Sequence, residues 1–286
     1  MQKTGWLIVN GSLQLKKFEN LYALLKNAAQ KQGVSLILKS NDELVFPVDE
    51  KIDLPDFALF WDKDIPLARR LEFLGLRLFN SRQAVEICDD KILTAEALVK
   101  DGVPTPTTIV APKTFENIGF SDFAFLQKAE NILGYPMVIK EANGSFGAQV
   151  YLAQNRAKAE EIIRKIGFKP FILQKFIAES SGRDIRVNVV GGKVVCAMER
   201  QNPNDFRSNI SGGGSGRKIA LTEKQEEIAL RACRAVGAEF AGVDLLFGKD
   251  TPLVCEVNSN PQFQSTLDAT GVDLADYIIQ YIKETI

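Results

Sequence analysis

Oxygen-bearing side chains interrupt two apolar segments in the last third of the sequence. AGVDLLF contains Asp244, and VCEVNSN contains Glu256 and Asn258. If both segments are strands and Phe247 faces Leu253 across the GKDTP connection, Asp244 lies opposite Glu256, and Asn258 shares that face. Opposed carboxylates repel unless a cation neutralises them, and oxygen ligands without Cys or His favour magnesium, usually held with a nucleotide's phosphates. The competing interpretation is the solvated face of an edge strand.

A lysine and a glycine-containing loop form the second candidate site. MVIKEANGSFG places Lys140 at the end of an apolar strand, directly before Gly144, Ser145 and Gly147. The lysine can pair with phosphate oxygens, and glycine N–H groups can approach the same anion closely. This is not a Walker A loop. The alternative is a hairpin turn with a solvated lysine.

Arginines gather around a strong hairpin pattern, RDIRVNVVGGKVVCAMER. The charged residues in or next to it include Arg183, Asp184, Arg186, Arg200 and Arg207. A two-residue turn at the glycine pair places Arg183 opposite Arg200 and Asp184 opposite Glu199, so like charges face each other. An anionic ligand would resolve the arginine conflict. A solvated hairpin surface is the alternative for any single arginine.

Two further segments fit a nucleotide site but are weak signals alone. ILQKFI, residues 172–177, can offer backbone hydrogen bonds to an adenine between apolar walls, although an ordinary core strand has the same pattern. SGGGSG, residues 211–216, has the composition of a linker, and a mobile active-site loop is equally consistent with its place between a strand and a helix.

The amino-acid composition excludes several classes of catalytic site and binding partner. The 286-residue chain contains no histidine, which excludes histidine-dependent triads, HExxH zinc sites and imidazole acid–base catalysis. A net charge of -1 gives no basic field for nucleic acid or anionic membranes, so no such partner is expected. No apolar run is long enough to span a bilayer, and the four cysteines lack CxxC spacing. We expect a cytoplasmic protein with buried free thiols.

The elements that position these residues indicate an α/β (α+β) protein. Apolar runs alternate with helical patterns over residues 1 to about 85, which predicts a small parallel α/β layer. Residues 81–102 are typical of one long helix, followed by a connector with two prolines. A second α+β unit follows, with helices predicted over residues 121–133 and 155–167, and antiparallel strands dominate from residue 183. We place the domains at 1–88, 89–178 and 179–286.

Taken in order, these motifs resemble the ATP-grasp superfamily, and within it the RimK-type α-L-glutamate ligases. The residues that carry the resemblance are Asp244 with EVNSNP, Lys140 with its glycine loop, RDIRVNVVGG, and FRSN followed by glycines. The match runs through nearly the whole chain from about residue 57. It implies an ATP-grasp fold with an N-terminal Rossmann-like (pre-ATP-grasp) α/β subdomain, a central subdomain carrying the lid and phosphate loop, and a C-terminal subdomain carrying the metal and substrate site.

The resemblance also implies a role for each matching residue. The metal ligands would be Asp244, Glu256 and Asn258. The nucleotide-binding residues would be Lys91, Lys140, Gly144, Ser145, Gly147, Gln174, Lys175, Phe176, Ile177, Asp184, Arg207, Ser208 and Asn209. The catalytic candidates are Arg186, Arg200 and Arg207, of which the first two would orient the acyl phosphate or substrate carboxylate and stabilise the oxyanion. Residues 212–214 would let a loop close over the reacting groups.

One position departs from the family pattern. The adenine hinge contains QKF where relatives commonly carry an acidic residue. Adenine contacts must then come from the backbone or from Gln174, and the resemblance assigns no firm side-chain role to Lys175. The N-terminal FWDKD, residues 60–64, also carries no transferable role.

The implied activity is amide or peptide bond formation through an acyl phosphate, with ATP and Mg2+ (or Mn2+) as cofactors. The substrates would be an amino acid, glutamate or a similar one, and a carboxylate acceptor that is a peptide, a protein or a small molecule. By analogy we expect a homodimer or homotetramer. Two alternatives stay open: an ATP-grasp macrocyclase of a precursor peptide, and a non-catalytic nucleotide-binding regulatory protein.

Overall fold

The N-terminal part of the chain forms a parallel sheet, which confirms the α/β layer expected there. The computed structural model describes residues 3–286. The strand order is β2-β1-β3-β4, and all neighbouring pairs are parallel. The strands are β1 (Thr4–Val9), β2 (Ser35–Ser40), β3 (Phe57–Trp61) and β4 (Leu78–Phe79). Every residue of β3 is buried, as in a central parallel strand that is covered on both faces.

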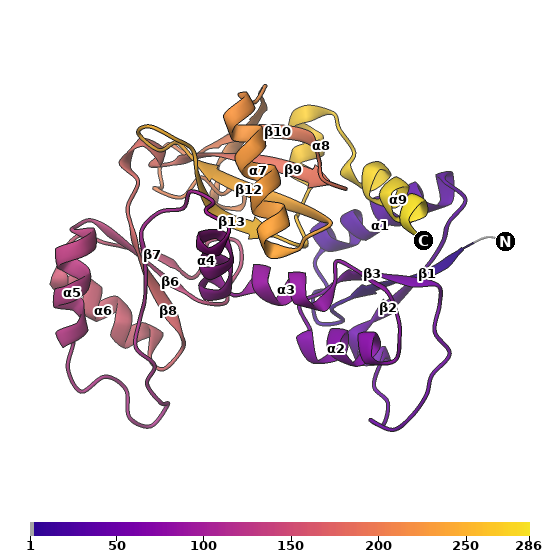
Figure 1. The fold of residues 1–286 in the computed structure, drawn as a ribbon, viewed down its shortest axis with the longest axis horizontal. Helices are drawn as coiled ribbons and strands as arrows, with labels where there is room; N and C mark the ends of the chain where they lie inside the picture. Colours follow the sequence, from indigo (N-terminus) through magenta and orange to yellow (C-terminus); the bar gives the residue numbers. More distant parts are fainter. Residues whose placement is uncertain (1–2) are drawn as a thin grey trace.

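Helices cover both faces of this first sheet. They are α1 (Lys16–Lys31), α2 (Ile65–Phe73) and, from the other end of the chain, α9 (Leu274–Thr285). Leu25 of α1 and Ile278 of α9 share a core with Leu7 of β1, whereas Leu71 of α2 packs with Ile8 on the opposite face. Figure 1 shows α9 lying beside α1, so the end of the described chain completes the core of its beginning.

The second sheet is antiparallel and carries two helices on one face. Its strand order is β5-β8-β6-β7. The elements are β5 (Thr108–Val110), α5 (Ala124–Leu133), β6 (Met137–Glu141), β7 (Val150–Ala153), α6 (Arg156–Ile166) and β8 (Phe171–Lys175). Leu126 of α5 and Ile163 of α6 share a core with Ile139 and Leu173 of the sheet. The helix expected over residues 121–133 is therefore confirmed, with a start three residues later.

The third sheet is also antiparallel, with the order β11-β10-β9-β12-β13. Its elements are β9 (Arg183–Val190), β10 (Lys193–Gln201), β11 (Ser215–Lys218), α7 (Glu223–Val236), β12 (Phe240–Leu246), β13 (Leu253–Asn258) and α8 (Gln264–Thr270). Ile228 of α7 packs with Val187 and Val243. Part of the SGGGSG segment is edge strand β11, so the segment is neither a plain linker nor wholly a loop.

The prediction of one helix over residues 81–102 is wrong. The chain forms α3 (Arg82–Asp89) and α4 (Lys91–Lys100), separated by Asp90 in an extended conformation. The Asp90 carboxylate accepts hydrogen bonds from the backbone N–H groups of Ile92 at 2.7 Å and Leu93 at 3.3 Å. Asp90 therefore caps a new helix. The break sets the position of Lys91, which begins α4.

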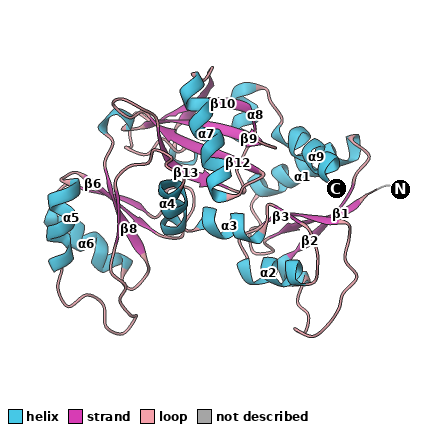
Figure 2. Cartoon of the chain, viewed as in Figure 1, coloured by secondary structure: helices cyan, strands magenta, loops and turns pink. Residues whose placement is uncertain are grey.

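Along the long axis of the molecule, the second sheet lies at one end, the first sheet at the other, and the third between them (Figures 1 and 2). Residues 3–286 also form three short 3-10 helices: η1 (Asn41–Glu43), η2 (Ala178–Ser180) and η3 (Ile210–Gly212). Leu98 of α4 and Val103 belong to the core under the third sheet. The domain boundaries at 88 and 178 stay a prediction. None of the helices within residues 3–286 is both long and apolar enough to cross a membrane.

Candidate active site

The two acidic strands pair so that Asp244 lies opposite Glu256, as predicted. The predicted pairing of Phe247 with Leu253 is wrong, because Leu246 faces Leu253. A β-bulge at Cys255 inserts one extra residue and restores the expected register before Asp244 is reached. Asp244, Glu256 and Asn258 all line one cavity.

The arginine hairpin has a different register from the predicted one. The two-residue turn is present, but the register shifts between Val194 and Cys196, where β10 carries an extra residue. Arg200 therefore faces Asp184, and Glu199 faces Ile185. The predicted opposition of like charges, Arg183 with Arg200 and Asp184 with Glu199, is wrong.

Buried ion pairs result from this shift. Arg200 Nε donates to Asp184 Oδ1 at 2.8 Å, and Arg200 Nη2 lies 2.9 Å from Asp244 Oδ1. Arg186 binds both oxygens of Asp244, with Nη2 to Oδ2 at 2.9 Å. All four side chains are at least nine-tenths buried. The sequence pattern predicts a metal ion as the group that neutralises Asp244. In the structure, Arg186 and Arg200 supply that positive charge.

Electrostatics keep this network ionised. Burial alone would raise the pKa of Asp244, but Arg186 and Arg200 lower it below its ordinary value. Burial would likewise lower the pKa of Arg200, and Asp244 and Asp184 raise it instead. The arginines are therefore fixed, charged donors at the cavity wall. Such groups suit the binding of a carboxylate or phosphoryl oxygen.

Glu256 and Asn258 offer oxygen atoms that fit a divalent ion. Asn258 Nδ2 donates to the Gly242 carbonyl at 3.2 Å, which leaves Asn258 Oδ1 as an acceptor. Within residues 3–286, the Glu256 carboxylate makes no hydrogen bond or ion pair to another side chain. The described residues contain no cluster of three or more acidic or cysteine side chains that could hold a metal. A free carboxylate and an amide oxygen suit magnesium, which commonly takes further ligands from phosphates and water.

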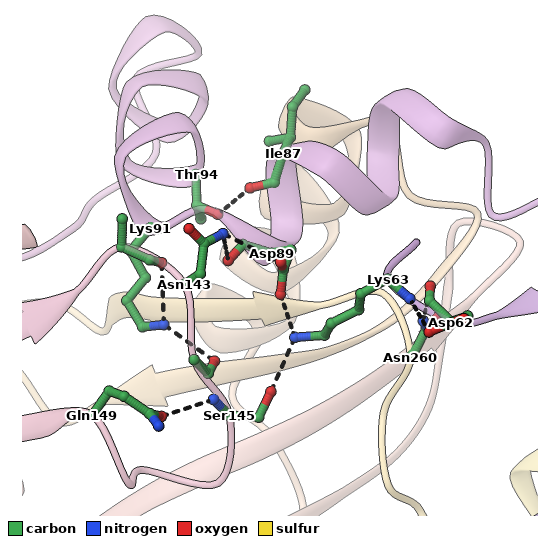
Figure 3. Close-up of polar contacts among 12 residues, drawn as sticks. Asp62, Lys63, Ile87, Asp89, Lys91, Thr94, Asn143, Ser145, Gln149 and Asn260 are labelled. Atoms are coloured by element: carbon green, nitrogen blue, oxygen red, sulfur yellow. Dashed lines mark hydrogen bonds and ion pairs between the residues drawn. The ribbon is translucent and has the colours of Figure 1, made fainter. Parts of the chain in front are cut away.

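Lys140 is a buried cation without a carboxylate partner among the described residues. Its side chain is 7% exposed, and Nζ donates to Cys255 Sγ at 3.4 Å. Lys91 Nζ approaches the carbonyl oxygens of Ala142 and Gly144 at 3.5 and 3.4 Å (Figure 3). Two ammonium groups thus border the cavity beside the glycine loop. A buried, uncompensated charge is costly, so this wall favours an anionic ligand.

The glycine loop contacts both neighbouring layers. Gly147 has φ of 72°, and a Cβ there would lie 2.8 Å from Asn209 Oδ1. Arg207 Nη1 donates to the Gly147 carbonyl at 2.7 Å, while Asp205 binds the rest of its guanidinium. On the other side, Lys63 Nζ donates to Ser145 Oγ at 3.1 Å (Figure 3).

The expected adenine hinge runs along the end of β8. Gln174 is 4% exposed, and its Nε2 donates to Thr108 Oγ1 at 2.8 Å, whereas Lys175 is exposed. Phe176 meets Phe206 edge to face, with ring centroids 6.4 Å apart. The Gln174 amide is thus partly engaged by Thr108, and the aromatic pair supplies an apolar wall for a planar ligand.

Every predicted site residue lines a single cavity of about 670 Å³. It is bordered by the second and third sheets and by residues of the first. The lining residues that the sequence reasoning missed include Asn10, Lys17, Tyr22, Trp61, Asp62, Lys63, Phe146 and Asn260. The sequence did contain a signal for this part of the site, because Asn10 and Asp62 are polar residues that directly follow β1 and β3. These two strands are neighbours in a parallel sheet. Ligands bind outside the carboxyl ends of such strands.

The fold is that of ATP-grasp ligases. The structure resembles D-cycloserine synthetase DcsG with a TM-score of 0.76 and 18% identity, over 99% of both chains. It also resembles a D-alanine–D-alanine ligase from Bacillus anthracis, with a TM-score of 0.73 and 20% identity, over 99% of this chain and 98% of that one. At these identities the likeness concerns the fold.

Sequence relatives give the family. Residues 88–282 match the RimK-like ATP-grasp domain. A probable alpha-L-glutamate ligase 1 of Shewanella frigidimarina is 38% identical over 221 residues, which are 76% of this chain and 71% of that protein. Human N-acetylaspartylglutamate synthase A is 36% identical over 82% of this chain and 60% of its own length. The chain belongs to the RimK-like ATP-grasp family of ligases.

Proposed function

We propose that the protein is an ATP- and magnesium-dependent ligase that joins a carboxylate to an amine through an acyl phosphate. One observation carries the proposal: the unpaired cations Lys91 and Lys140, the free oxygen donors of Glu256 and Asn258, and buried arginines all border one cavity. The lysines would bind phosphates, the oxygen atoms would bind a divalent ion, and the arginines would bind a substrate carboxylate. In the resulting scheme, Mn2+ can replace Mg2+.

In the first half-reaction, the substrate carboxylate attacks the γ-phosphorus of ATP, an acyl phosphate forms and ADP leaves. Lys91, Lys140 and the N–H groups of the glycine loop hold the phosphates in line. Glu256 and Asn258 would hold the magnesium ion with free oxygen atoms, and Asp244 would join them by giving up an arginine contact. When bound, that ion supplies charge neutralisation on the phosphate oxygens.

In the second half-reaction, a neutral amine attacks the acyl carbon, its nitrogen loses one proton to solvent, and inorganic phosphate leaves with the bonding electrons of the broken C–O bond. Arg186 and Arg200 are placed to stabilise the oxyanion of the tetrahedral intermediate, because both are buried, charged and fixed by carboxylates. Arg207 lies at the glycine loop and contributes to closure over the phosphates. The remaining nucleotide contacts come from Asp184, Ser208, Asn209 and the hinge Gln174, Lys175, Phe176 and Ile177.

The relatives suggest the substrates. Their names refer to glutamate ligation and to N-acetylaspartylglutamate. We propose that this chain adds glutamate or a similar amino acid to a peptide, a protein or a small carboxylate, and works as a homodimer or homotetramer.

The test measures ADP release and product mass. Protein, ATP and magnesium are combined with a panel of amino acids and carboxylate acceptors. We expect ADP together with a product heavier by one amino acid residue, and the loss of both in Glu256→Gln. Asp250→Asn is the matched control, because Asp250 is exposed on the β12–β13 turn and lies outside the cavity lining. A product that has lost water without gaining a residue would indicate macrocyclisation instead. ATP binding without turnover would indicate a regulatory protein.

A further inference from the structure

Asp62 is a buried carboxylate that the proposed reaction does not yet use. It follows β3 directly, is 6% exposed and lines the cavity. Its side chain accepts from Asn10 Nδ2 at 3.1 Å and from the Lys63 backbone N–H at 2.7 Å. Both donors are neutral. Within residues 3–286, no lysine or arginine forms an ion pair with Asp62.

The nearest lysine is directed elsewhere. Figure 3 shows the Lys63 side chain extending away from Asp62. Its ammonium group donates hydrogen bonds to Asp89 and Ser145 instead. Asp62 therefore keeps a negative charge that no ion pair neutralises within the described residues, and the charge of Lys63 offsets the effect of burial on its pKa only in part. Burial raises its pKa, as expected for a desolvated carboxylate. The same carboxylate helps burial to raise the pKa of the neighbouring Tyr22 to about 12.

Asn260 provides a second acceptor at the same place. Its Nδ2 donates to the Asp62 carbonyl at 2.8 Å, which fixes the orientation of the amide (Figure 3). Asn260 Oδ1 is then buried, and it has no hydrogen-bond partner within the described chain. Such orphaned acceptors are uncommon in folded proteins and indicate an absent donor.

These acceptors define the chemistry of the missing group. It carries a positive charge, because it faces an uncompensated carboxylate, and several N–H donors, because it serves both Asp62 and Asn260. Asn10 already donates to Asp62, which leaves few lone pairs for the coordination shell of a metal ion. A primary ammonium group fits both requirements.

We propose that Asp62 and Asn260 bind the ammonium group of the amino-acid substrate, which gives up a proton to solvent before it attacks as a neutral amine, and so select a substrate with a free amino group. The inference rests on the proposed ligase function and gives the FWDKD segment a role in it. Asn260 follows the suggested metal ligand Asn258 by two residues, just after β13 ends, and both residues line the same cavity. The ammonium site therefore adjoins the metal and phosphate sites in one cavity.

The test compares the binding of free and N-blocked amino acids. Calorimetric titrations with ADP and magnesium present use each of the twenty amino acids and, for those that bind, the N-acetyl and desamino forms. We expect at least one free amino acid to bind roughly 10-fold or more tightly than its two analogues, as charged hydrogen bonds allow. In Asp62→Asn this ratio should fall towards one.

Asp64→Asn is the matched control. It makes the same chemical change two residues away, at the N-cap of α2 and outside the cavity lining, and should keep the wild-type ratio. Equal binding of the N-acetyl form, no binding of any amino acid, or an unchanged ratio in Asp62→Asn would overturn the inference. ADP release is measured separately on the same proteins. Turnover without discrimination defeats the ammonium site alone, whereas discrimination without turnover defeats the ligase proposal alone.

Discussion

At the scale of single residues, the site combines charges that compensate each other with charges that do not. Arg186, Arg200, Asp184 and Asp244 neutralise one another in the interior. Lys140 and Asp62 have no such partner among the described side chains. Removal of a compensated group strands its partner in the interior, whereas an uncompensated group marks where a ligand's charge belongs. The two kinds respond differently to mutation.

Removal of Arg200 is expected to destabilise the protein strongly. Arg200→Met leaves the buried Asp184 without its partner, and Asp244 with only one, so the free energy of unfolding should fall by about 3–5 kcal/mol. Urea denaturation measures the loss. The double variant Arg200→Met/Asp184→Leu removes the stranded charge as well and should recover much of the stability. A double variant no more stable than the single one would contradict this explanation.

Removal of the Asp62 charge should stabilise the protein at neutral pH, in contrast to removal of Arg200. Its folded-state pKa is raised, so its contribution to stability is complete below the unfolded-state pKa and is lost as the pH rises through the folded-state pKa. At pH 7 the wild type therefore bears the cost of a buried charge. Asp62→Asn should have the larger free energy of unfolding at pH 7, and the difference should close as the pH falls into the acid range. Denaturation curves at several pH values test this, and a variant that is less stable at pH 7 would contradict it.

At the scale of elements, the sequence predicts the type of most helices and strands but not their irregularities. Periodicity identifies the parallel layer, the Gly-Gly hairpin and the helix over residues 156–166. The bulges at residue 195 and at Cys255 leave the apolar alternation looking intact, because the extra residue in each is itself apolar or small. Register errors of one residue follow, and they decide which charges meet.

The break between α3 and α4 has an identifiable cause in Asp90. Asp90→Ala removes the N-cap and should lower the free energy of unfolding by about 1 kcal/mol. Because Lys91 begins α4, the KM for ATP should rise as well. Asp90→Asn keeps a capping oxygen and is the control, expected to stay close to wild type in stability. Denaturation and ATP kinetics on both variants check the assignment, and an equal loss of stability in both would contradict the cap.

At the scale of the whole molecule, the cavity is assembled from parts of the chain that are far apart in sequence. The cavity residues in the second and third sheets could be predicted from motifs, because those residues match a family pattern. The contribution of Asn10, Asp62 and Lys63 was missed, because it depends on the adjacency of β1 and β3 and on how the first sheet packs against the rest. Neither property is visible in a local sequence pattern.

Lys63 connects these layers. Its ammonium group joins Asp89 to Ser145 of the glycine loop, and Phe146 of that loop meets Phe18 of α1 edge to face. Lys63→Met should raise the KM for ATP roughly two- to five-fold, the scale of a partly exposed ion pair. Backbone hydrogen exchange over residues 143–149 should also become faster.

The exposed Lys51 provides the control for this prediction. Lys51→Met removes a lysine outside the cavity lining and should change neither the KM for ATP nor the exchange rates. Wild-type exchange and ATP kinetics in Lys63→Met would show that the contact does not hold the loop.

The packing of α9 against α1 has a consequence for synthesis on the ribosome. Leu274, Ile278, Ile279 and Ile282 fill the core that α1 and the first sheet share. During synthesis α1 must therefore wait, with its apolar face uncovered, until the 242 residues between Lys31 and Leu274, and then α9 itself, have been made. Nascent chains of this protein are thus a natural client for chaperones that shield apolar surface, and the N-terminal layer should not fold when translated alone.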